Sequence, residues 1–147
     1  MKYEVKDTNP KDSIGIKKVS LSVLPAQVLM EIGLALMEGG RKYGVSNYRV
    51  AGVRASVYYD ASMRHLMSWW EGQDIDPDSG LSHVTKAIAG LTVLRDSMLN
   101  DMCNDDRPPK VKNLEFICDY NKKAEEIIEK YPVAVKPYTE LNKGEKR

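Results

Sequence analysis

The spacing of apolar residues between positions 81 and 102 constrains the fold of this chain more than any other feature. The intervals are three or four residues, which places these side chains on one face of an α-helix: Leu81, Val84, Ile88, Leu91, Leu94 or Arg95, Met98 and Met102. Asp76-Pro77 precedes the run, and this pair is typical of a helix cap followed by a first-turn proline. We therefore predict a helix that follows a cap at Asp76 and ends before the loop CNDDRPPK.

The same spacing predicts three further helices, over residues 26–38, about 54–70 and about 113–130. Pro25 suits the first turn of the first helix, and Gly39-Gly40 can end it. Residues 39–52 then form a glycine-punctuated loop. The expected fold is all-α, a four-helix bundle.

Chain length and the positions of the breaker residues predict one domain, 1–147. It comprises an extended N-terminal arm (1–20), a helical core (21–131) and a C-terminal tail (132–147). KVSLSVLP, residues 18–25, could pair as a short strand, but one strand makes no sheet.

The composition excludes several classes of protein. The chain has 22 basic and 21 acidic residues, so no global field favours nucleic acid or a membrane surface. No apolar run is long enough to span a membrane, and the first residues lack the layout of a signal peptide. We therefore expect a cytoplasmic protein whose Cys103 and Cys118 are ordinary thiols.

Histidines and aspartates gather in the stretch RHLMSWWEGQDIDPDSGLSHVTKA. If the second and third predicted helices form an antiparallel hairpin, the connection brings His65 and His83 to the same end of the bundle. Together with Asp76 and Asp78 they could bind a metal ion. The alternative is two packed imidazoles beside aspartates that stabilise a helix N-terminus. A calcium-binding loop does not fit, because such a loop requires glycine at its sixth position and glutamate at its twelfth, and this stretch has neither at those positions.

Glu38 and the loop after it suggest a second set of ligands. A carboxylate at a helix C-terminus faces the negative end of the dipole, so another group should favour it there. That group could be a divalent cation, or a salt bridge to Arg41 or Lys42. Lys42, Tyr43 and Asn47, with Arg49, suit phosphates or a base, although a solvated loop would have the same composition. Trp69 and Trp70 could stack on a base, or they could be core.

The motifs NPKDSIG, MEGGRKYGVSNYR, RHLMSWWEGQDIDPDSGLSH and DDRPPK, in this order, resemble a phage-encoded family described as dATP/dGTP diphosphohydrolase, N-terminal domain. The resemblance runs from about residue 9 to 110. It implies an all-α, MazG-like fold, a divalent metal, and hydrolysis of purine deoxynucleoside triphosphates to monophosphate and pyrophosphate.

The sequence departs from the MazG pattern, in which EExxE on one helix and ExxD on the next surround the metal. The literal EExxE here, Glu125 to Glu129, is followed by Pro132 and a tail, so we interpret it as a solvated helix face. The first two helices offer only Glu31, Glu38 and Asp60 in plausible register. Either another set of residues binds the metal, or the chain binds nucleotides without cleaving them.

Three functions stay open at this point. The first is a pyrophosphohydrolase of purine nucleoside triphosphates that uses Mg²⁺ or Mn²⁺. The second is a nucleotide-binding module that sequesters a nucleotide signal in phage counter-defence, and the third is an adaptor. For the enzyme, the candidate site residues are Glu38, Asp78 and His83 in catalysis, Glu38, His65, Asp76 and Asp78 for the metal, and Lys42, Tyr43, Asn47, Arg64 and Trp69 for the substrate. We expect a homo-oligomer, because uncovered apolar helix faces favour a second chain.

Overall fold

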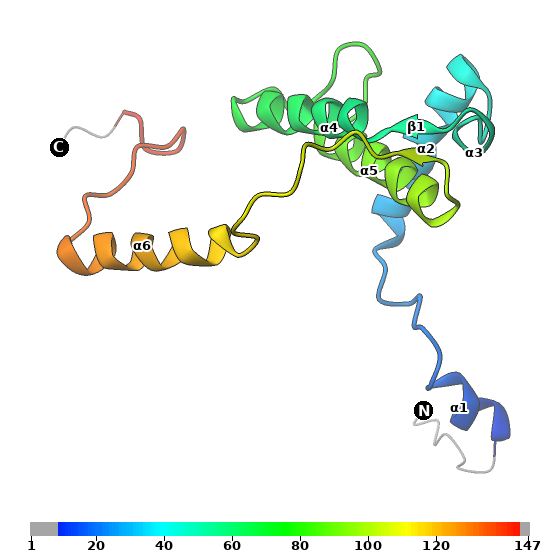
Figure 1. Cartoon of the computed structure of the whole chain (residues 1–147), viewed down its shortest axis with the longest axis horizontal. Helices are drawn as coiled ribbons and strands as arrows, with labels where there is room; N and C mark the ends of the chain where they lie inside the picture. Colours follow the sequence, from blue (N-terminus) through cyan, green and yellow to red (C-terminus); the bar gives the residue numbers. More distant parts are fainter. Residues whose placement is uncertain (1–8, 145–147) are drawn as a thin grey trace. The chain divides into compact units, whose positions relative to one another are not determined.

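The computed structural model describes residues 9–144, and nearly all of its regular structure is helical (Figure 1). The predicted all-α fold is confirmed. The elements in chain order are α1 Pro10–Gly15, α2 Ala26–Tyr43, α3 Tyr48–Ala51, β1 Val53–Arg54, α4 Ala55–Trp70, α5 His83–Leu99, β2 Cys103–Asn104 and α6 Phe116–Lys130. The start of the predicted arm, residues 1–8, lies outside the described residues.

The chain divides into two compact units, Met1–Arg107 and Pro108–Arg147. The second unit contains α6, an amphipathic helix with Phe116, Tyr120 and Ile127 exposed along one face. The first unit contains every residue proposed above for the site. One domain over the whole chain stays a prediction.

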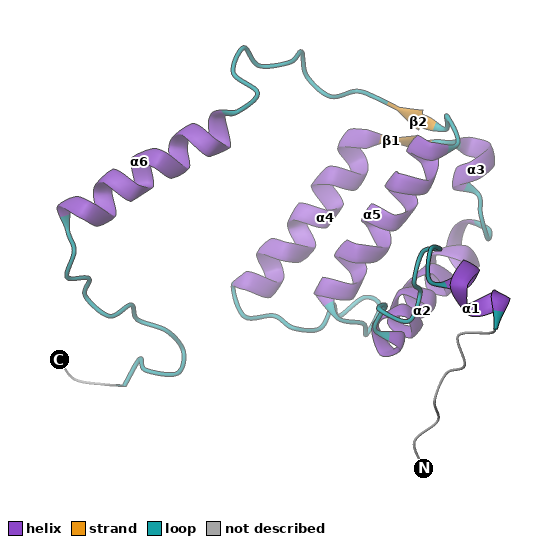
Figure 2. Ribbon diagram, turned by 90° about the horizontal axis from the view of Figure 1, so that it is seen from below, coloured by secondary structure: helices purple, strands orange, loops and turns teal. Residues whose placement is uncertain are grey.

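Helices α4 and α5 form an antiparallel hairpin and lie side by side (Figure 2). Most of their buried residues are small, among them Ala55, Ser62, Ala87, Ala89 and Ser97. Small side chains at a contact let two helix axes approach closely. Helix α2 also packs on α5 and buries Ala35. This three-helix arrangement positions the site.

A two-stranded parallel sheet joins the start of α4 to the end of α5. Val53 pairs with Cys103, and the Val53 amide donates to the Met102 carbonyl at 2.9 Å. Gly52 approaches the same carbonyl with φ +75°, and a Cβ at this position would lie 2.9 Å from the Met102 oxygen. Only glycine fits this turn without strain.

The predicted end of the first helix is wrong. Helix α2 continues through Gly39-Gly40 to Tyr43, and Gly44 ends it with φ +95°. A glycine inside a helix costs only about 1 kcal/mol relative to alanine, which packing against another helix can offset. Lys42 and Tyr43 therefore lie on the last turn of α2 rather than in a loop.

The predicted cap of the third helix is also wrong. Helix α5 begins at His83, and the Ser82 hydroxyl accepts from the Val84 amide at 3.1 Å. The connection folds back on itself through a bridge between Ile75 and Ser82, so the helix cannot begin earlier. Asp76 instead stabilises this connection and accepts from the Ser79 hydroxyl at 2.7 Å.

Three smaller boundaries differ from the predictions. Helix α5 ends at Leu99 rather than near Met102, because the chain turns at Asp101, with φ 55°, into β2. Helix α6 begins at Phe116, three residues after the predicted start. Residues 18–25 form turns and loop instead of a strand. No helix within residues 9–144 is long and apolar enough to cross a membrane.

Candidate functional site

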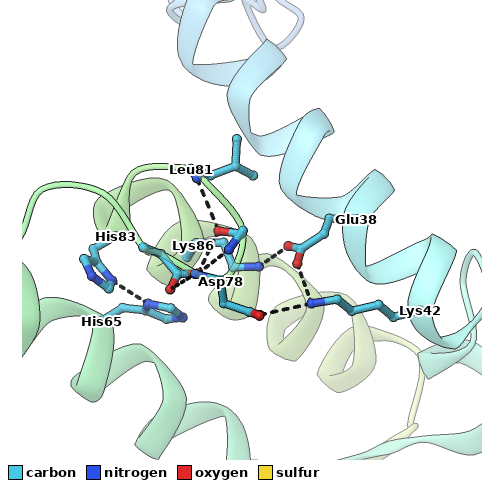
Figure 3. A network of polar contacts seen from close by, with 9 residues as sticks. Glu38, Lys42, His65, Asp78, Leu81, His83 and Lys86 are labelled. Carbon is cyan, nitrogen blue, oxygen red and sulfur yellow. Dashed lines mark hydrogen bonds and ion pairs between the residues drawn. The ribbon is translucent and has the colours of Figure 1, made fainter.

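A network of charges joins α2, α5 and the connection before α5 (Figure 3). The Glu38 carboxylate accepts from the Lys42 ammonium at 2.5 Å and, through its other oxygen, from Lys86. Lys42 also contacts Asp78 Oδ2 at 3.2 Å. The Lys42 ammonium therefore lies between two carboxylates that are distant in the sequence.

Burial differs strongly across this network. The side chains of Glu38 and Lys86 are 21% and 19% exposed, whereas that of Asp78 is 81% exposed. Hydrogen bonds from Lys42 and then Lys86 lower the pKa of the Glu38 carboxyl, and hydrogen bonds to Glu38 and Asp78 raise the pKa of Lys42. At neutral pH Glu38 is an anion held by two cations.

The predicted meeting of the two histidines is confirmed. His65 Nδ1 lies 2.8 Å from His83 Nδ1, and His83 Nε2 lies 2.9 Å from Gln73 Oε1. An amide oxygen can only accept, so His83 carries its proton on Nε2 and donates it to Gln73. His83 Nδ1 must then accept from His65 Nδ1–H, and this fixes the tautomers of both rings.

These two hydrogen bonds leave a lone pair on His65 Nε2. Burial is the main cause that lowers the pKa of His65, Asp76 opposes it, and the nearby charge of Lys86 lowers the pKa further. The ring is therefore neutral at physiological pH, and Nε2 is ready to accept a proton. His83 is 4% exposed and uses both of its ring nitrogens.

A cavity of about 740 Å³ opens beside these groups in the first unit. His65 and Lys86 line it together with three tyrosines from three helices, Tyr43, Tyr48 and Tyr58. The rest of the lining is mostly small or aliphatic: Gly33, Ala35, Leu36, Met37, Gly39, Gly40, Val45, Ser46, Asn47, Val57, Ala61, Ser62, Ala89, Gly90 and Val93. Aromatic and aliphatic walls with a few polar groups are typical of small-molecule sites.

The cavity also meets a buried hydroxyl. Ser62 is 5% exposed, and its Oγ has no hydrogen-bond partner within residues 9–144. Ser97 is the second such hydroxyl in this part of the chain, and it does not line the cavity. Leaving a buried hydroxyl unpaired costs about 1 to 3 kcal/mol. Burial also raises the pKa of the Tyr58 phenol.

The structure brings together only part of the predicted site. Tyr43, Asn47 and His65 line the cavity, and Glu38, Lys42 and Asp78 are linked beside it. Arg64 and Trp69 are exposed and are absent from the cavity wall, and Trp69 packs at 6.0 Å from Trp70 between ring centres. No three His, Cys, Asp or Glu side chains within residues 9–144 cluster as a metal site.

Sequence reasoning missed Lys86, Tyr48, Tyr58 and Ser62. The sequence could have indicated Lys86, because it follows His83 by three positions and therefore lies on the same face of the helix. Tyr58 and Ser62 also have the spacing of one helix face, four residues apart. Nothing in the sequence indicates that this face meets Gly90 of α5, since that depends on how α4 and α5 pack.

Comparison with known proteins adds two findings. The family described as "dATP/dGTP diphosphohydrolase, N-terminal" matches residues 8–107. A protein of Salmonella phage PMBT28, named "dATP/dGTP diphosphohydrolase", is 30% identical over 90 residues, which cover 61% of this chain and 30% of that protein. The chain thus spans less than a third of that relative. No solved structure matches.

Proposed function

Because the chain belongs to the dATP/dGTP diphosphohydrolase N-terminal family, we propose that it hydrolyses purine deoxynucleoside triphosphates to monophosphate and pyrophosphate. One observation carries this proposal beyond family membership. A cavity with aromatic walls adjoins a neutral imidazole and two lysines, which is what a base, a water molecule and a polyphosphate require.

The tyrosine-lined part of the cavity fits a nucleobase, and Lys42 and Lys86 fit the phosphates. Tyr43 and Tyr48 offer flat aromatic surface for stacking, and Asn47 offers an amide. Phosphate oxygens compete with the Glu38 carboxylate for the two ammonium groups, and an ammonium beside a phosphate neutralises charge that develops during reaction. Arg64 stays a prediction as a further cation, and Trp69 as a further stacking surface.

A divalent cation fits the carboxylates of this network. The Lys42 ammonium already occupies a cationic position between Glu38 and Asp78. Magnesium is commonly held by one or two carboxylates plus substrate phosphates, so a cluster of three protein ligands is not required. We propose that Glu38 and Asp78 hold Mg²⁺ or Mn²⁺, with Asp76 and His65 as weaker candidates. When bound, the metal supplies charge that polarises phosphoryl oxygens.

The reaction needs a group that takes a proton from water. Water oxygen forms a bond to the α-phosphorus, the bond from this phosphorus to the bridging oxygen breaks, and pyrophosphate leaves with that electron pair. His65 Nε2 has the lone pair, the neutral state and the position on the cavity wall to accept the proton. Its Nδ1–H bond to His83 then stabilises the imidazolium that forms.

His83 acts in this scheme as a positioning residue. Both of its nitrogens are used and it is buried, so it holds the His65 ring and tautomer rather than touching the substrate. Its predicted catalytic role thus becomes an indirect one. His83→Gln should lower kcat and leave KM nearly unchanged, because substrate contacts stay in place.

The test is turnover of dATP and dGTP with Mg²⁺ or Mn²⁺, with products separated by ion-exchange chromatography. Wild-type protein should release monophosphate and pyrophosphate, and Glu38→Gln and His65→Gln should lose about 100-fold or more in kcat. Asp96→Asn is the control. Asp96 pairs with Arg49 at a distance of 2.8 Å, and neither residue lines the cavity. Full activity of both site variants would overturn the residue assignments.

Nucleotide binding without turnover is the second candidate. It is favoured by the two lysines that hold the Glu38 carboxylate. A sequestering module would retain its nucleotide in stoichiometric amount. Denaturation followed by chromatography should then recover the ligand unchanged, whereas recovery of monophosphate would favour the enzyme.

We also propose a homo-oligomer in the host-cell cytoplasm. The face of α2 carries Met30, Leu34 and Met37, which are 72%, 50% and 64% exposed. A stripe of this kind on one helix favours coverage by a second copy. Light scattering of wild type and Leu34→Glu tests this, and a monomeric wild-type protein would contradict it.

A further inference from the structure

We propose that the Ser62 hydroxyl binds the position-6 substituent of the purine base. This inference rests on the proposed function and adds the contact that reads the base. It starts from Ser62, which lines the cavity and is 5% exposed, and whose buried hydroxyl oxygen has no partner within residues 9–144.

The hydroxyl does not use the partner that a helical serine normally has. Serine inside a helix commonly donates to the carbonyl four residues earlier, which here belongs to Tyr58. Ser62 makes no such bond. Most buried polar groups are paired, and an unpaired one in a binding cavity indicates a partner that arrives with the ligand.

The opposite helix packs closely on this hydroxyl and has a glycine where a side chain would crowd it. Gly90 of α5 lies across from Ser62, and a Cβ at Gly90 would lie 3.3 Å from Ser62 Oγ. Gly90 also lines the cavity, together with Ala61 and Val93. Ser62 is the polar side chain among these three neighbours, and Tyr58 and His65 line the cavity one turn away on α4.

The chemistry of a hydroxyl matches the two purines named for the family. At position 6 adenine presents an amino donor and guanine a carbonyl acceptor. A serine hydroxyl can accept from the first and donate to the second, because its hydrogen rotates freely. A carboxylate or an ammonium at this place would favour one base over the other. Ser62 therefore admits both purines at one contact.

The experiment measures kcat/KM for dATP, dGTP and the triphosphate of purine deoxyriboside, which lacks the position-6 substituent. Wild type should process the last compound about 3- to 10-fold less well, as expected for one neutral hydrogen bond. Ser62→Ala should lose the same factor for dATP and dGTP, and should lose nothing further for purine deoxyriboside triphosphate.

The stability of the free protein supplies a second readout. Ser62→Ala removes an unpaired hydroxyl, so its Tm without nucleotide should equal or exceed that of wild type. Ser97→Ala is the matched control, because it removes the other unpaired buried hydroxyl away from the cavity wall. It should also keep or raise Tm, and its kcat/KM should equal that of wild type.

Failure of this inference is distinct from failure of the proposed function. If wild type hydrolyses no purine nucleotide, the proposed function fails and this contact fails with it. If wild type is active and Ser62→Ala keeps full kcat/KM for dATP and dGTP, only the contact is overturned. A Tm of Ser62→Ala below that of Ser97→Ala and wild type would show a partner within the protein and also overturn it.

Discussion

Replacement of Glu38 by glutamine tests whether the charged network holds α2 on α5. Exposed ion pairs contribute under about 1 kcal/mol, whereas removal of one partner from a buried pair costs about 3 to 5 kcal/mol. Glu38 and Lys86 lie between these cases, with side chains 21% and 19% exposed. We expect Glu38→Gln to lower the free energy of unfolding by about 2 kcal/mol, which corresponds to a decrease in Tm of roughly 6 to 8 °C.

Urea denaturation followed by far-ultraviolet circular dichroism measures this change. Asp78→Asn is the control, because it removes a carboxylate that contacts the same Lys42 but is 81% exposed. It should leave the midpoint unchanged. In a Lys86→Met background, Glu38→Gln should lower the free energy of unfolding less, because the Lys86 ammonium that the substitution would leave unpaired is absent. Equal midpoints for Glu38→Gln and Asp78→Asn, or an undiminished effect in that background, would refute the reasoning.

Two further predictions concern pH and a turn. The pKa of His65 in the folded protein is lowered from 6.5, so protonation of this ring favours the unfolded chain. The free energy of unfolding should therefore be highest above pH 6.5 and should decrease as the pH falls through the lowered pKa. Urea midpoints between about pH 7.5 and 5 should show this slope in wild type but not in His65→Gln, and equal slopes would contradict it. Gly52→Ala should cost at least about 1 to 3 kcal/mol from backbone strain alone, because φ is +75° and the Met102 oxygen lies 2.9 Å from the new Cβ. Gly72→Ala, with φ +104° and open space, should lower the thermal midpoint less, and the reverse order would refute this account.

Helical periodicity predicted the main elements, because burial on one face leaves a regular signal in the sequence. The helix ends were harder to predict. Asp76-Pro77 and Ser82 both have the composition of a helix start, and the bridge between Ile75 and Ser82 decides between them. Likewise, Gly39-Gly40 could end a helix or continue it, and the packing of α2 on α5 favours continuation.

The candidate site divides in a similar way. The meeting of His65 and His83 followed from hairpin geometry, since both lie near the ends joined by one connection. The pairing of Glu38 with Lys86 did not, because these residues are 48 positions apart on helices whose crossing the sequence does not specify. The cavity residues Tyr58 and Ser62 had helical spacing but no sign of what they face.

The short parallel sheet also has a consequence for the order of folding. Pairing Val53 with Cys103 closes a loop of about 50 residues, whose ends cost about 3.5 kcal/mol of chain entropy to bring together. Two residues per strand cannot offset this cost alone, so we expect the pair to form only after α4 and α5 have docked. The Val53 amide, which donates to Met102 at 2.9 Å, should therefore exchange its hydrogen when the hairpin opens. This single amide is a reporter of hairpin integrity in hydrogen-exchange measurements.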